Sequence, residues 1–71
     1  MNDEIVTVVE VCIIGGQTTA RWFGNYPREL AERLIWNNDL LRMAKDYFPD
    51  AESFDEAKRK AVEEVINALR S

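Results

Sequence analysis

The first part of the chain is rich in β-branched apolar residues and shows no helical spacing. Residues 4–14 read EIVTVVEVCII, and residues 17–25 read QTTARWFGN. β-branched and aromatic side chains of this kind favour extended strands. Gly15 and Gly16, between the two runs, can take the positive φ angles of a tight two-residue turn. The pattern predicts an antiparallel β-hairpin with its turn at the two glycines.

The glycine turn also sets the register of the hairpin. With Ile14 opposite Gln17, the further pairs are Cys12–Thr19, Val11–Ala20, Glu10–Arg21, Val9–Trp22 and Val8–Phe23. Opposite charges then face each other at one pair, and each aromatic side chain faces a valine, which are favourable cross-strand pairings. A slip of one residue would lose all of them, so the sequence favours this register.

Apolar spacings of three, four and seven residues follow the hairpin. The stripe consists of Leu30, Leu34, Leu41, Ala44 and Phe48. Pro27 suits the first position of a helix, and Pro49 ends the pattern. The sequence NND at 37–39 interrupts it with three poor helix formers, and Asn38 suits the N-cap of a new helix. We expect one helix over 27–48, kinked at this point, with two short helices broken near Asn37 as the alternative.

The last third of the chain has the clearest helical pattern. Ser53 and Glu56 have the spacing of an N-terminal capping box. The apolar stripe that follows consists of Ala57, Ala61, Val62, Val65, Ile66 and Leu69. Oppositely charged residues four apart support the outer face, at Asp55–Arg59, Glu56–Lys60 and Lys60–Glu64. We predict a helix over 53–70.

The order strand, strand, helix, helix predicts a single small α+β domain over residues 1–71, in which both helices pack on one face of the hairpin. The residues expected to be buried together are Val9, Val11, Trp22, Leu30, Leu34, Leu41, Val62, Val65, Ile66 and Leu69.

The other face of the predicted hairpin is also apolar and would have no helix to cover it. An exposed apolar face beside an unpaired strand edge generally marks an interaction site. We therefore predict a protein interface at Val6, Val8, Glu10, Arg21 and Phe23. The occupant would be a second copy, giving a homodimer, or another protein bound by strand addition. The alternative is that the N-terminus or the helix ends fold over this face.

Composition weighs against catalysis. The 71 residues are 46% apolar and 31% charged, which indicates one folded domain rather than a disordered chain. Histidine, the residue used most often for acid–base work, is absent. Cys12 therefore lacks its usual activating base, and no acidic run follows the spacing of a Ca²⁺ loop. We expect no enzyme activity, no cofactor and no metal site.

The sequence shows no pattern typical of a targeting or membrane segment. The chain opens with MNDEIV, which is acidic, and its longest apolar run is far shorter than a membrane span. A lone cysteine inside a strand suits a reducing compartment. We therefore expect a cytoplasmic protein that does not associate with membranes.

The net charge disfavours nucleic acid as a partner. Nine basic and 13 acidic residues give −4 at neutral pH, whereas affinity for phosphate backbones comes from clustered Lys and Arg. The opposing feature is the segment from Arg21 to Arg28, where Trp22, Phe23 and Tyr26 lie between two arginines and could stack on bases. The predicted register places Trp22 and Tyr26 on the core face, which favours packing over base stacking.

A second candidate surface is an acidic patch. It consists of Asp46, Asp50, Glu52, Asp55 and Glu56. A polar loop and a helix start account for such acids without any binding role. The functional alternative is docking to a basic partner surface, including one that normally binds nucleic acid.

These features favour a small acidic, non-enzymatic protein that acts by occupying the surface of another protein, as an accessory factor or inhibitor. A phage or mobile-element protein that blocks a host machine would have this size and composition, which is an argument by association. The alternatives are a small nucleic-acid-binding regulator that uses the Arg21–Arg28 segment and a structural subunit whose hairpin completes a larger β-sheet.

Overall fold

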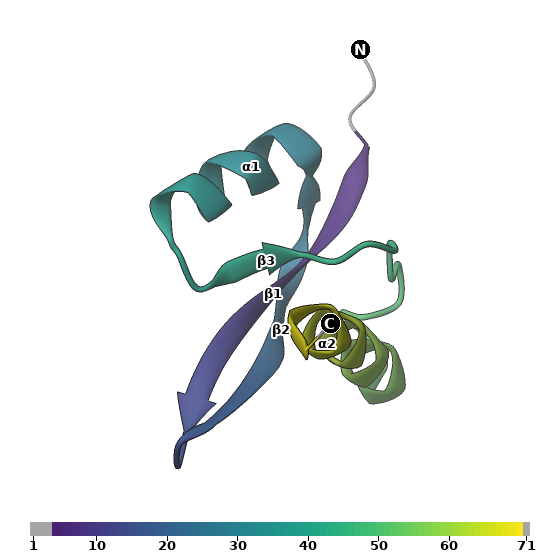
Figure 1. Ribbon diagram of the computed structural model, residues 1–71. Helices are drawn as coiled ribbons and strands as arrows, with labels where there is room; N and C mark the ends of the chain where they lie inside the picture. Colours follow the sequence, from purple (N-terminus) through teal and green to yellow (C-terminus); the bar gives the residue numbers. More distant parts are fainter. Residues whose placement is uncertain (1–3, 71) are drawn as a thin grey trace.

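The computed structural model describes residues 4–70, which form a three-stranded antiparallel sheet and two helices (Figure 1). In chain order the elements are β1 (Ile5–Ile14), β2 (Gln17–Pro27), α1 (Arg28–Asn37), β3 (Leu41–Met43) and α2 (Asp55–Arg70). β1 is the central strand, with β2 on one side and β3 on the other. The predicted α+β class and hairpin are confirmed, whereas the predicted order of elements lacked β3.

The two helices cover opposite faces of the sheet (Figure 1). The layer beneath α1 buries Val6, Val8, Ala31 and Leu41. The layer beneath α2 buries Val9, Val11, Ala44, Ala61 and Val65. Successive side chains of a strand point to opposite faces, so β1, which is apolar on both, is buried only if each face has a cover. The prediction that both helices share one face was wrong for this reason.

The residues predicted to be buried together are divided between the two layers. Those that are buried are Val9, Val11, Leu41 and Val65, and those that are half-buried are Trp22, Leu34, Val62 and Ile66. Leu30 and Leu69 remain 43% and 44% exposed. Most residues of the predicted core are thus buried or half-buried, but they form two thin layers rather than one.

A β-bulge in β2 changes the second half of the hairpin. The predicted register is confirmed from the turn as far as Trp22, which lies opposite Val9. Beyond this point Val8 pairs with Gly24 rather than with Phe23, so Phe23 is an extra residue on β2. Such a residue shifts every later side chain of the strand to the other face.

Tyr26 shows the consequence of the bulge. It packs on the α1 face, with Val6 as its partner across the strands, whereas Trp22 lies on the α2 face. The ring of Tyr26 lies over Gly24, where an added Cβ would be only 2.6 Å from the ring atom Cε2. Phe23 packs beside the same ring, with centroids 5.9 Å apart. The prediction that Trp22 and Tyr26 share a face was therefore wrong.

The chain turns sharply after α1 instead of continuing as a helix. Asn38 has extended backbone angles, with φ −147° and ψ 106°. Its Oδ1 accepts the N–H of Leu40 at 3.0 Å, and its carbonyl oxygen accepts the N–H of Leu41 at 3.1 Å. Asparagine readily forms such local turns. The predicted break near Asn37 marks the end of α1 correctly, but a strand follows it, so the prediction of a helix over 27–48 was wrong.

The predicted C-terminal helix is confirmed as α2, which begins at Asp55, two residues later than predicted. The ion pair between Glu56 and Lys60 is present at 3.9 Å. Arg59 pairs with Glu63 at 4.0 Å rather than with Asp55.

A buried threonine attaches the loop between β3 and α2 to the sheet. The side chain of Thr7 is fully buried, and its hydroxyl donates to Asn25 Oδ1 at 2.7 Å and accepts the N–H of Phe48 at 2.9 Å. Asn25 Nδ2 donates to the carbonyl oxygen of Phe48 at 3.1 Å and closes the ring of hydrogen bonds. Both backbone polar groups of Phe48 are thus satisfied, which fixes the loop at this point.

A glutamate holds the same loop from the helix side. The carboxylate of Glu64 in α2 accepts the N–H of Lys45 at 2.7 Å and the N–H of Asp46 at 2.9 Å. Charge-assisted hydrogen bonds of this kind are stronger than neutral ones. The loop after β3 is therefore held between the sheet and α2.

Candidate protein-binding surface

The structure separates the five residues of the predicted interface. Val6 and Val8 are only 5% and 0% exposed, because α1 covers them. The expectation that these two side chains face solvent is corrected, since it assumed that α1 lay on the other face. Glu10 is half-buried, and Arg21 and Phe23 are exposed. Arg21 and Phe23 are therefore the exposed members of the predicted interface.

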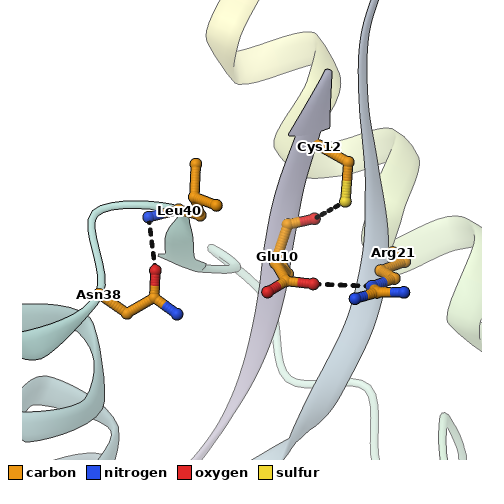
Figure 2. Close-up of polar contacts among 5 residues, drawn as sticks. All are labelled: Glu10, Cys12, Arg21, Asn38 and Leu40. Atoms are coloured by element: carbon orange, nitrogen blue, oxygen red, sulfur yellow. Dashed lines mark hydrogen bonds and ion pairs between the residues drawn. The ribbon is translucent and has the colours of Figure 1, made fainter. Parts of the chain in front are cut away.

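The predicted ion pair of the hairpin is present. Figure 2 shows Arg21 Nε directed at the carboxylate of Glu10, at 2.7 Å. The hydrogen bond to Glu10, and then its negative charge, raise the pKa of Arg21. The Arg21 side chain is still 74% exposed, so its guanidinium keeps N–H groups available at the surface. Cys12 lies on the same face, with Sγ 3.7 Å from the carbonyl oxygen of Glu10 (Figure 2).

The outer edge of β3 is short and is shielded at Leu41. Arg42 lies opposite Val9, so the backbone groups of Leu41 point away from β1. The N–H of Leu41 donates to Asn38, and its carbonyl oxygen accepts a hydrogen bond from Arg42 Nη1 at 2.8 Å. The same guanidinium nitrogen donates to the carbonyl oxygen of Asp39. Shielding of this kind disfavours pairing with another strand.

The outer edge of β2 is open. β1 directs the carbonyl of Thr7 and the N–H of Val11 toward the β3 side, so its even-numbered residues bond to β2. In the observed register the backbone groups of Thr18 and Ala20 therefore point away from β1. Within residues 4–70, no strand lies beside this edge. β2 is also the longest strand, with 11 residues.

A shallow groove runs beside the open edge, between β2 and α2. Its lining consists of Ala20, Arg21, Trp22, Lys58, Arg59 and Val62. Lys58 Nζ lies over the ring of Trp22, 5.2 Å from its centroid, which is a cation–π contact. The residues at this groove include three basic ones and no acidic one, in a protein whose net charge is −4.

The indole nitrogen of Trp22 has an unusual environment. Nε1 is out of contact with solvent and has no hydrogen-bond partner among the described residues. A buried donor left unpaired costs about 1–3 kcal/mol. The ring is held here by packing and by Lys58 rather than by a polar contact.

Replacing Trp22 with phenylalanine should therefore change stability little. The lost contacts of the larger ring are offset by removal of the unpaired N–H, and we expect a net change within about 1 kcal/mol. Urea unfolding of the Trp22→Phe variant measures this. Trp22→Ala is the control and should cost at least about 2 kcal/mol. An equal loss in both variants would show that Nε1 is satisfied after all.

Two further apolar features lie at the surface. The turn end of the hairpin projects beyond both helices (Figure 1), and Ile13 and Ile14 there are 73% and 69% exposed. Trp36, near the end of α1, is 87% exposed. The tip continues the open edge of β2, whereas Trp36 lies on a different element.

The acidic residues of the second candidate patch are all exposed. Asp46, Asp50, Glu52, Asp55 and Glu56 occupy the loop after β3 and the first turn of α2. Glu56 is engaged by Lys60, and the backbone of Asp46 is held by Glu64. Among residues 4–70, no three potential metal-ligating side chains come together.

The basic and aromatic residues of the Arg21–Arg28 segment do not form one platform. Arg21 is paired with Glu10, and Arg28 with Glu4 at 2.7 Å. The bulge directs Trp22 and Tyr26 to opposite faces of the sheet. The segment therefore does not offer aromatic rings side by side for stacking on bases.

The comparisons with known proteins give no relative for this chain. No protein-family model matches it, and neither the curated proteins nor the solved structures contain a match. Among the described residues, no helix has the length and apolar character needed to cross a bilayer.

Proposed function

We propose that this chain is a non-enzymatic protein-binding module that docks on a partner protein through the open edge of β2. The observation that supports this is the contrast between the two edges of the sheet. The edge at β3 is three residues long and shielded at Leu41 by Arg42, whereas β2 presents the backbone groups of Thr18 and Ala20 outward. An exposed edge is a template for an added strand, which gains main-chain hydrogen bonds.

The titratable groups support binding rather than catalysis. The chain has no histidine. The pKa of Glu4 is lowered by its hydrogen bond to Arg28, and the pKa values of Arg21 and Arg28 are raised by their carboxylate partners. These shifts come from exposed ion pairs, whereas catalytic groups are typically perturbed by burial in a cleft.

A proline at Thr18 tests the role of the edge. The N–H of Thr18 points outward, so proline removes one docking donor and blocks the edge without breaking the bonds between β1 and β2. Thr18→Val is the matched control because it keeps the N–H. Proteins captured from a cell lysate by the wild type and by Thr18→Val should be lost with Thr18→Pro.

Circular dichroism should show that both variants are folded. Capture of the same proteins by Thr18→Pro would contradict docking at this edge, and the hairpin tip with Ile13 and Ile14 would become the better surface.

A further inference from the structure

We infer that the occupant of the β2 edge is an extended segment of another protein that carries acidic side chains, and not a second copy of this chain. This inference rests on the proposed function, because it names the partner chemistry for the same edge. It depends on where the cations beside β2 lie and on what neutralises them.

The cations flank the edge on both faces of the sheet. Arg21 is on the face of Glu10, whereas Lys58 and Arg59 extend from α2 on the opposite face. Side chains of an added strand alternate between the two faces. Two adjacent acidic residues in such a strand would therefore reach Arg21 on one face and the two α2 cations on the other.

These cations are only partly compensated within the protein. Lys58 has no ion pair among residues 4–70 and lies instead over Trp22. Arg59 is 4.0 Å from Glu63, at the outer limit of an ion pair, and its side chain is 68% exposed. Charges of this kind favour a partner of opposite sign and raise its rate of association.

The floor of the groove adds an apolar contact. Ala20, Trp22 and Val62 line it beneath the cations. A residue two positions from the acid on the α2 face would lie over this floor, since alternate residues of a strand share a face. The segment that fits best is an extended one with adjacent acids and a small apolar residue nearby.

A second copy fits this edge poorly. Pairing of β2 with β2 of another copy around a two-fold axis places the same surface on both sides of the contact. With the axis beside Ala20, the cations that flank the edge in one copy, Arg21, Lys58 and Arg59, lie near those of the other copy, and no acidic residue lines the groove between them. Like charges that oppose each other across neighbouring strands are destabilising.

Synthetic peptides test the inference directly. The probe is a ten-residue peptide of threonine, valine and alanine with two adjacent central glutamates, and the matched probes carry two glutamines or two lysines there. We expect the glutamate peptide to bind roughly tenfold more tightly than the glutamine peptide, with the lysine peptide weakest. Added salt should reduce the difference. The measurements are fluorescence anisotropy and amide shifts of Thr18 and Ala20.

Charge reversal on α2 is the second test of the acidic partner. The double variant Lys58→Glu/Arg59→Glu should reverse the preference toward the lysine peptide. Arg33→Glu, which reverses an exposed cation on α1 that pairs with Glu29, is the control and should leave the preference unchanged.

The outcomes separate this inference from the proposed function. Equal binding of all three peptides, abolished by Thr18→Pro, would keep the edge as a docking site and overturn the acidic partner. Binding unaffected by Thr18→Pro would contradict the edge itself. Failure of the glutamate peptide to bind at millimolar concentration, or a dimer in light scattering that Thr18→Pro dissociates, would overturn the inference.

Discussion

Replacing Val8 with glutamate is expected to unfold the protein. Val8 is fully buried in the central strand, beneath α1, in one layer with Ala31 and Leu41. The layer around Val8 is apolar, and Arg28, which contacts Met43 at its edge, is already paired with Glu4, so the new carboxylate would be buried without a matched partner. Burial of an unpaired charge costs several kcal/mol, and a domain of this size has only about 3–5 kcal/mol of stability. Circular dichroism should show loss of the cooperative thermal transition.

Ile14→Glu is the matched control for this substitution. Ile14 lies on the same strand and the same face as Val8, but it is 69% exposed because it extends beyond α1. This variant should stay folded, with a change in stability below about 1 kcal/mol. A folded Val8→Glu variant would mean that α1 does not cover this face, and Val6 and Val8 would again be candidates for the interface.

The burial of Val8 and the exposure of Ile14 could not be predicted from the apolar spacing alone. The sequence showed that β1 is apolar on both faces, and such a strand is normally covered on both. The missing information was β3, which reverses the chain and allows α1 and α2 to lie on opposite faces. A three-residue strand is too short for its alternation to be distinguished from other patterns.

Residues of β3 and of the loop after it also have the apolar spacing of a helix. Leu41, Ala44 and Phe48 continue the spacing of Leu34 and are all removed from solvent to some degree. They are buried by a strand and a loop rather than by a helix face. The physical signal that outweighs the spacing is the run of poor helix formers at 37–39. There the side chain of Asn38 accepts a hydrogen bond from the backbone N–H of Leu40, which competes with helix formation.

The register of the first half of the hairpin was predictable because the glycine turn and the cross-strand side-chain pairs favour the same alignment. Both glycines take positive φ, 57° and 79°, and the pairing of Glu10 with Arg21 follows from that turn. The bulge at Phe23 was missed, although Gly24 inside a strand is a known sign of one. Its effect on the candidate site is direct, since it sends Tyr26 to the α1 face and leaves Trp22 beside the open edge.

Replacing Thr7 with valine should be the most informative change to the core. Valine has nearly the same shape, so the packing is kept, but the hydroxyl that joins Asn25 to Phe48 is lost. The N–H of Phe48 and Oδ1 of Asn25 would each lose a hydrogen bond in a partly buried site. We expect a loss of about 1–3 kcal/mol in the free energy of unfolding, measured by urea titration. Amide exchange at Phe48 should also become faster.

Thr7→Ser distinguishes the hydroxyl from the methyl group of this side chain. Serine keeps the donor and acceptor and removes one methyl, which costs about 1 kcal/mol in a buried site. It should preserve slow amide exchange at Phe48, whereas Thr7→Val should not. Equal exchange rates in the two variants would show that packing, rather than the ring of hydrogen bonds, holds the loop. Because the loop leads directly into α2, a loosened Phe48 should also broaden the amide signals of Lys58 and its neighbours beside the β2 edge.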